Sequence, residues 1–301
     1  MKVRCPAMSN VYELVTERIL ALLEQGQIPW HKPWAAVNGG AFNRVTGRRY
    51  SLLNQMMLSH AGEYASLAQW NRLGGSVKKG SKSEIVVFFK QEEEDKEELE
   101  PAEEKDDRKK SRFILKYYRV FHISQVEGVE PLPRPELECN FNPIAEAERV
   151  LHDYLDLEGV QFDQGLSDKA FYRPSDDSIH VPAMSQFGKI ADYYSTLFHE
   201  CVHSTGHASR LHRPGIQHVN FGSETYSKEE LVAELGASCL LQSLGISTED
   251  SIRNSAGYVQ GWLDVLRSDK RMVVFAASAA EKACKFILDC SKFPKESMTV
   301  N

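Results

Sequence analysis

The sequence has no hydrophobic run of membrane-spanning length, no CxxC pair and no internal repeat. Without an apolar stretch of about 20 residues, a transmembrane helix is not expected. The first residues lead into a polar helical pattern and lack the apolar core of a signal peptide. The six cysteines, at positions 5, 139, 201, 239, 284 and 290, are scattered, which fits reduced thiols better than a disulfide framework. We therefore expect a cytoplasmic protein that has no membrane partner.

The charge of the chain is distributed unevenly around a net value of −6. Residues 1–90 carry 12 Lys/Arg against 5 Asp/Glu, whereas residues 91–107 carry 2 against 11. Residues 108–130 are basic again, with 6 against 2, and residues 131–301 are acidic, with 16 against 24. A basic half joined to an acidic half is typical of a nucleic-acid-facing domain attached to a domain with another task.

The 301 residues are enough for two domains, and their periodicity predicts an α+β fold. Residues 1–130 should form an N-terminal α+β domain, 131–140 a Pro-rich linker, and 141–301 a mainly helical domain with a small β-sheet. The expected helices lie near residues 11–23, 52–58, 65–73, 144–154, 226–237, 255–267 and 272–288, and another carries residues 199–203 after a buried apolar approach from residue 190. A hairpin should pair 84–89 with 113–123, and short strands should lie near 171–172 and 179–181. We expect the domains to fold separately with modest coupling.

Residues 91–111 are almost wholly charged, so we expect a solvated, mobile insertion inside the hairpin. In the simplest interpretation this insertion only extends the hairpin. In the alternative, it is an acidic segment that competes with DNA for the basic face of the domain.

The string His199-Glu200-Cys201-Val202-His203 carries the most chemical information in the chain. Residues i and i+4 share a helix face, so His199 and His203 can each direct a ring nitrogen at one metal ion. Glu200 would then lie beside the open coordination position as the catalytic base. There its carboxylate can accept the proton of a water that attacks a polarised carbonyl.

The helical segment 226–237 offers the third ligand that such a site needs. Catalytic zinc usually takes three protein ligands, and two His with one Glu is a standard set. Glu230 can bind the metal, and Glu234, one turn on, can accept the N–H of a ligating imidazole and fix its tautomer. Glu229 is the rival ligand, but Ala233, one turn on from it, offers no such support. We therefore expect Glu229→Ala to leave metal content near that of the wild type. Zn²⁺ is the expected cofactor, with Mn²⁺ or another divalent ion as the alternative.

His207 and His212 are further candidates near the motif. The residues from His203 to Gly206 begin like the metzincin pattern HExxHxxGxxH, but position 209 is Ser where that pattern needs its third His. The metzincin interpretation therefore fails. His207 suits the C-terminus of a helix, where a cation or an N–H donor is favoured. A role near the metal is its alternative.

Cationic and planar side chains alternate along the basic half of the chain. Lys and Arg neutralise phosphates, and exposed aromatic rings stack on unpaired bases, each contributing roughly 1–3 kcal/mol. Three of the four Trp lie in this half, which favours single-stranded DNA as the partner. The candidate DNA contacts are Trp30, Lys32, Trp34, Arg44, Arg48, Arg49, Tyr50, Asn54, Trp70, Arg72, Lys78, Lys79 and Lys82. In the alternative interpretation, Trp30 and Trp34 are core residues that anchor an extended segment.

These motifs resemble a known family over essentially the whole chain. The first half, from Val11 to Trp30 and then through residues 49–54 and 70–80, resembles the single-stranded-DNA-binding domain of plasmid antirestriction proteins and related primases. Residues 199–211 followed by 226–237 resemble the zincin-like metallopeptidase domain attached to it, of the glutamate type in which HExxH precedes a helix bearing E-x-x-x-[DE]. The resemblance implies an antirestriction protein that binds single-stranded DNA non-specifically and protects incoming plasmid or phage DNA from host restriction.

Two interpretations of the metal motif stay open. The protein is either a DNA-binding protector with a structural or vestigial metal site, or a zinc-dependent metallopeptidase that DNA binding directs to a host protein substrate. An intact Glu200 favours chemistry, because a structural zinc needs no general base. DNA protection, however, does not require proteolysis. In either case residues 1–130 are expected to retain most of the DNA binding.

Overall fold

The computed structural model describes residues 8–30, 40–92, 112–133, 142–214, 216, 224–246 and 256–291. Most of the predicted insertion at 91–111, and all but the first three residues of the predicted linker at 131–140, lie outside these ranges. No described helix combines the length and the apolar character that a membrane span requires.

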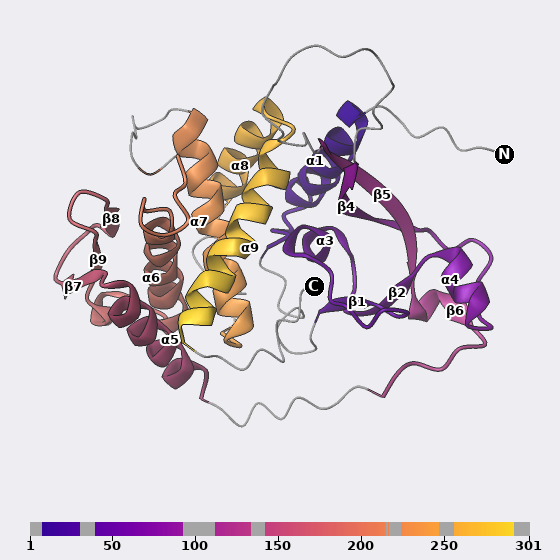
Figure 1. The fold of residues 1–301 in the computed structure, drawn as a ribbon, viewed down its shortest axis with the longest axis horizontal. Coiled ribbons are helices and arrows are strands. Elements are labelled where there is room, and N and C mark those ends of the chain that lie inside the picture. Colours follow the sequence, from indigo (N-terminus) through magenta and orange to yellow (C-terminus); the bar gives the residue numbers. More distant parts are fainter. Residues whose placement is uncertain are drawn as a thin grey trace, which may run out of the picture.

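The first half is built on a four-stranded sheet in the order β1-β2-β5-β4 (Figure 1). Its strands are β1 (Ala41–Asn43), β2 (Gly62–Ala65), β4 (Glu84–Glu92) and β5 (Arg112–His122). β1 and β2 are parallel, and the remaining pairs are antiparallel. The predicted hairpin is confirmed as β4–β5, while the short strands β1 and β2 were not predicted. Strands β3 (Ser76–Val77) and β6 (Val126–Glu127) form a separate two-stranded sheet.

Alternate residues of β4 and β5 point to opposite faces of the hairpin, and helices cover one of these faces. Val87 and Leu115 point toward α1 (Met8–Glu24) and α3 (Leu52–Met57) and are buried in the main core. On the opposite face, Val86 and Val120 join a small core of their own. A third helix, α4 (Leu67–Arg72), starts at Ser66 with a capping box.

The second half consists of five helices in the described ranges and a three-stranded sheet in the order β7-β9-β8. The helices are α5 (Pro143–Glu158), α6 (Ile190–Thr205), α7 (Glu224–Ser243), α8 (Ala256–Ser268) and α9 (Met272–Cys290). The strands are β7 (Gln161–Gly165), β8 (Phe171–Arg173) and β9 (Ser178–Pro182). Short 3₁₀ turns occupy Ile123–Gln125 and Met184–Gln186. The mix of helices and mainly antiparallel sheets confirms the predicted α+β class.

α7 is the central helix of this half, packed between α6 and α9. Nearly every residue from Leu231 to Leu241 is buried, as expected for a helix that is apolar on all sides. The approach to the HExxH motif is buried at Tyr194, Leu197 and Phe198 of α6, which are 0% exposed, whereas Ile190 at its start is exposed.

The main hydrophobic core runs through both halves, which favours a stronger coupling than the modest one expected. This core joins Val11, Leu53 and Val87 of the first half to Leu231, Val273 and Ile287 of the second. Trp30 marks the junction: its ring packs edge-on against Trp262, with ring centroids 6.3 Å apart. The Trp30 carbonyl accepts hydrogen bonds from Ser238 and Gln242 of α7. Apolar packing and hydrogen bonds therefore both join the two halves.

Candidate metal centre and nucleic-acid interface

Helices α6 and α7 bring together three side chains that could hold a metal ion, which are His199, His203 and Glu230. The two Nε2 atoms of the imidazoles are 3.1 Å apart. The Glu230 carboxylate oxygens lie 3.4 Å from His199 Nε2 and 3.5 Å from His203 Nε2. A tetrahedral ion with bonds of about 2.0–2.1 Å separates its ligand atoms by about 3.3–3.4 Å. The three side chains thus have the spacing that one metal ion would need.

A carboxylate lies behind each imidazole, on the side away from this cluster. Glu234 Oε2 is 3.6 Å from His199 Nδ1, and Glu229 Oε1 is 3.4 Å from His203 Nδ1. Arg213 in turn holds Glu229, with its Nη2 2.7 Å from Oε1 and its Nε 3.0 Å from Oε2. Glu229, whose replacement was expected to leave the metal content unchanged, thus lies behind His203 as Glu234 lies behind His199.

The electrostatics of the cluster favour a bound cation. Burial opposes a charge on His203, but Glu229 and Glu230 outweigh it and raise the pKa of His203 to about 10. Burial alone would likewise raise the pKa of Glu230, yet the two imidazoles hold it below its usual value. Such shifts mean that positive charge is stabilised at this point, as protons or as a metal ion. The donor set and its surroundings fit a divalent metal.

Glu200 is only 7% exposed and follows His199 directly along α6. The thiol of Cys201, the next residue, is fully buried, and burial raises its pKa well above the ordinary value. Cys201 is thus an apolar core residue on the far side of the helix from the histidines. The carboxylate of Glu200 is close enough to the cluster to contribute to the raised pKa of His199 and of His203.

The other two candidate histidines lie outside this cluster. His207 Nδ1 is 2.8 Å from Ser209 Oγ, just beyond the C-terminus of α6. His212 is exposed and takes a left-handed backbone conformation with φ of 49°. Among the described residues, the group that could hold a metal ion consists of His199, His203 and Glu230.

Four of the predicted DNA contacts are buried, which contradicts their assignment. Trp30, Tyr50, Asn54 and Trp70 are 1%, 4%, 0% and 0% exposed. Trp70 Nε1 donates to the carbonyl of Phe121, and the Asn54 amide bonds both backbone groups of Val87. These side chains hold the domain together, and their surfaces are not open to a base.

The predicted cationic DNA contacts divide into partly buried and exposed side chains. Arg44 is paired with the fully buried Glu63, and Arg49 is half-buried. The exposed cations are Arg48, Arg72, Lys78, Lys79 and Lys82. Lys32 and Trp34 lie outside the described residues.

Two exposed aromatic residues of the β4–β5 hairpin were missed by the sequence analysis. Phe88 is 46% exposed and Tyr118 is 51% exposed, with their ring centroids 5.9 Å apart. Lys116 pairs with Phe88 in register and so lies on the same face. The predicted hairpin already indicated one of them, because Phe88 follows the buried Val87 and so must point to the opposite face of the strand.

Two protein families match the chain in succession. The N-terminal domain of the anti-restriction factor ArdC matches residues 9–121, and a zincin-like metallopeptidase domain matches residues 147–279. An uncharacterized protein, y4eC of Sinorhizobium fredii, is 32% identical over 288 residues, covering 91% of this chain and 90% of that protein. Two Escherichia coli DNA primases TraC are each 35% identical over 92% of this chain, which spans only 20% and 27% of their lengths.

The structure is also similar to solved structures. The Mn(II)-bound crystal structure of the antirestriction protein ArdC of plasmid R388 superposes with a TM-score of 0.69 at 32% identity, covering 93% of this chain and 98% of that one. The metal-free structure of the same protein gives a TM-score of 0.68. Fold and site thus define a two-domain protein in which an N-terminal domain of the antirestriction type precedes a zincin-like metallopeptidase domain. The chain belongs to the ArdC family of antirestriction proteins.

Proposed function

We propose that this protein binds single-stranded DNA non-specifically and thereby protects incoming plasmid or phage DNA from host restriction. The exposed surface of the first domain is the observation that carries the DNA part of this proposal. Exposed on this domain are the cations Arg48, Lys78, Lys79 and Lys82 and the rings of Phe88 and Tyr118. Cations neutralise phosphates without regard to sequence, and rings stack on any unpaired base. Duplex DNA offers no unpaired bases, so single strands should bind more tightly.

We further propose that His199, His203 and Glu230 hold one divalent metal ion. Zn²⁺ is the first candidate because two His and one Glu are a zinc set, and Mn²⁺ is the alternative because the R388 relative binds Mn(II). When bound, such an ion polarises a carbonyl and makes a neighbouring water more acidic. Glu200 would accept the proton of that water, while Glu229 and Glu234 keep the two imidazoles in the ligating tautomer.

A DNA-directed metallopeptidase that cleaves a host protein is the second candidate function. Its specific support is Glu200, which a structural metal site would not need. The two candidates share the metal site and differ in whether peptide hydrolysis is required for protection.

The binding of labelled oligonucleotides tests the proposed DNA surface. Phe88→Ala/Tyr118→Ala should lower the affinity for single strands by roughly tenfold or more, given about 1–3 kcal/mol per stacked base. The same variant should leave the weak binding to duplex nearly unchanged. Leu166→Ala/Met184→Ala, which removes two exposed apolar side chains of the second domain, is the control. Equal affinity of the wild type for single strands and duplex would contradict the proposal.

A further inference from the structure

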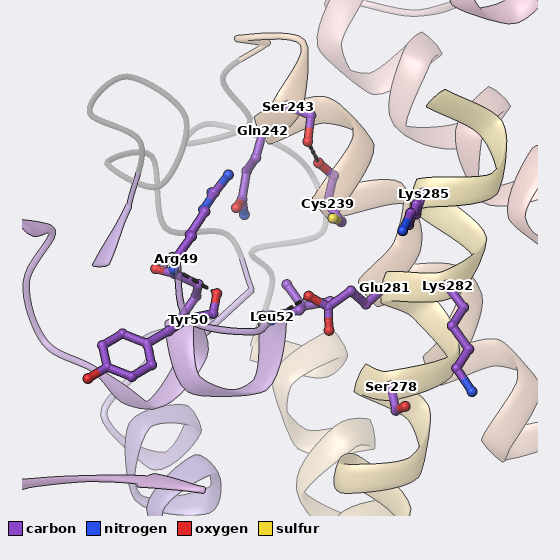
Figure 2. A pocket seen from close by; sticks show the side chains of 11 residues that line it. Arg49, Tyr50, Leu52, Cys239, Gln242, Ser243, Ser278, Glu281, Lys282 and Lys285 are labelled. Atoms are coloured by element: carbon purple, nitrogen blue, oxygen red, sulfur yellow. Dashed lines mark hydrogen bonds between the residues drawn. The ribbon is translucent and has the colours of Figure 1, made fainter. Parts of the chain in front are cut away.

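A pocket of about 210 Å³ lies where the first domain meets helices α7 and α9 (Figure 2). Arg49 and Leu52 of the first domain form one wall. Gln242 and Ser243 at the end of α7, with Glu281, Lys282 and Lys285 of α9, form the other walls. The pocket is separate from the metal cluster, although α7 contributes residues to both.

The lining carries more positive than negative charge. Its three cations are Arg49, Lys282 and Lys285, and Glu281 is its one carboxylate. Glu281 is already engaged, because its Oε1 accepts the N–H of Leu52, 3.3 Å away, at the first turn of α3. Burial raises the pKa of Glu281 above its usual value, although the N–H of Leu52 and the nearby Arg49 and Lys285 act in the opposite direction. Cations that only donate hydrogen bonds suit an anion with several acceptor oxygens.

Gly40 leaves room for the side chains of Arg49 and Gln55 beside this pocket. Gly40 has φ of +70°, and a Cβ atom there would lie 3.2 Å from Arg49 Nε and 2.8 Å from Gln55 Oε1. The positive φ and the close Gln55 side chain both favour glycine at this position. In Figure 2 this side chain extends from its loop toward Gln242 of α7.

We propose that this pocket binds the phosphate of a nucleotide, as part of a single DNA strand that crosses from the first domain onto α9. Arg48, the neighbour of Arg49, is exposed on the first domain, and Lys282 and Lys285 are exposed on α9. These cations would continue the track of the strand across the junction of the two domains. The inference rests on the proposed single-stranded-DNA binding and extends it to two lysines of the metallopeptidase domain. A free nucleotide presents the same phosphate chemistry, so the test includes both.

The test compares Lys282→Gln/Lys285→Gln with a control pair in the same domain, Lys169→Gln/Lys189→Gln, using the full-length protein. All four lysines are exposed, so neither pair should unfold the protein, which thermal unfolding checks. An oligo-dT probe of about 20 nucleotides exceeds a single site of about 4–16 nucleotides. Loss of two phosphate contacts should lower the slope of log K against log salt by about 1.4, and the affinity at low salt by about tenfold. The control pair should keep the wild-type slope.

The outcomes separate this inference from the proposed function. If the wild type prefers single strands and the α9 pair changes neither slope nor affinity relative to the control pair, the pocket assignment is overturned and the proposed function stands. If the wild type shows no preference for single strands, the proposed function fails. In that case a separate measurement tests the pocket, namely the effect of thymidine 5′-monophosphate at millimolar concentration on thermal unfolding. The nucleotide should raise the Tm of the wild type but not that of the Lys282→Gln/Lys285→Gln variant. An equal Tm response of both proteins overturns the inference.

Discussion

At the scale of single residues, the imidazoles of His199 and His203 each lie between the metal-binding cluster and a carboxylate. Glu234 stands behind His199, and Glu229, itself held by Arg213, stands behind His203. A carboxylate in this position fixes the ring orientation and increases the basicity of the ligating nitrogen. We expect Glu229→Gln and Glu234→Gln each to lower metal affinity by about 10- to 100-fold, and Glu230→Gln to lower it further.

A chelator competition with one divalent metal at a time measures these affinities. Glu130→Gln, a change at an exposed position of the first domain, is the control and should bind metal like the wild type. If Glu229→Gln emptied the site while Glu230→Gln left it intact, the ligand and the supporting residue would have to be exchanged.

The sequence predicts such residues where the residues that interact are close together along the chain, and fails where they are brought together by the fold. Helical spacing alone placed His199 and His203 on one face and Glu234 one turn from Glu230. The role of Glu229 depends on Arg213, which an irregular segment brings back to α7, and no periodicity describes that path. Likewise, composition identified aromatic residues in the basic half, but only packing shows that Trp70 is buried and that Tyr118 is exposed.

At the scale of elements, the metal site depends on how closely α7 approaches α6. A Cβ atom at Gly236 would lie 2.7 Å from Val202 Cγ2, so glycine permits this contact. Gly236→Ala should force the helices apart and destabilise the fold by about 1–3 kcal/mol, with a loss of metal affinity as Glu230 moves away. Urea unfolding with chelator present and metal titration measure the two effects. The double change Gly236→Ala/Val202→Ala makes room for the added methyl and should restore much of the metal affinity. A Gly236→Ala variant that keeps the wild-type metal affinity would contradict this account.

A second link joins the end of α6 to the small sheet. The fully buried guanidinium of Arg210 donates to the Ser204 carbonyl at 2.8 Å and pairs with Asp177. Burial alone would raise the pKa of Asp177, but hydrogen bonds from Arg210 and Tyr172 lower it below the usual value. Because the folded pKa is the lower one, this link stabilises the fold fully above about pH 4 and is lost as the pH falls through the folded pKa.

Asp177→Asn tests this link, since Asn tolerates the φ of 50° at that position. The variant should be less stable than the wild type by about 2 kcal/mol near neutral pH. The difference should shrink in acid, as the wild-type carboxylate becomes protonated. Urea unfolding across the pH range from neutral to acid measures it, and a difference that stays constant down to the most acidic pH would contradict the assignment.

At the scale of the whole molecule, the common core should make the stability of each half depend on the other. The Pro-rich stretch and the opposite charge balances suggested independent domains, but neither feature reports which apolar faces meet. Trp30 packs against Trp262 of α8, and α3 packs against α9. We therefore expect residues 1–130 alone to lose cooperative thermal unfolding and much of the single-strand affinity, while the whole chain unfolds in one main transition. Calorimetry of the fragment and the whole chain makes the comparison. A fragment that unfolds cooperatively near the Tm of the whole chain would show that the halves are separable after all.

The central claim is that occupancy of single-stranded DNA, rather than proteolysis, protects incoming DNA. Restriction protection in cells by Glu200→Gln tests it most directly, because this variant loses the base but keeps the metal ligands and the DNA surface. Lys78→Gln/Lys79→Gln/Lys82→Gln is the counterpart, with exposed cations removed and the metal site untouched. We predict that Glu200→Gln protects like the wild type and that the triple lysine variant does not. Loss of protection by a Glu200→Gln protein that still binds DNA and metal normally would contradict the claim.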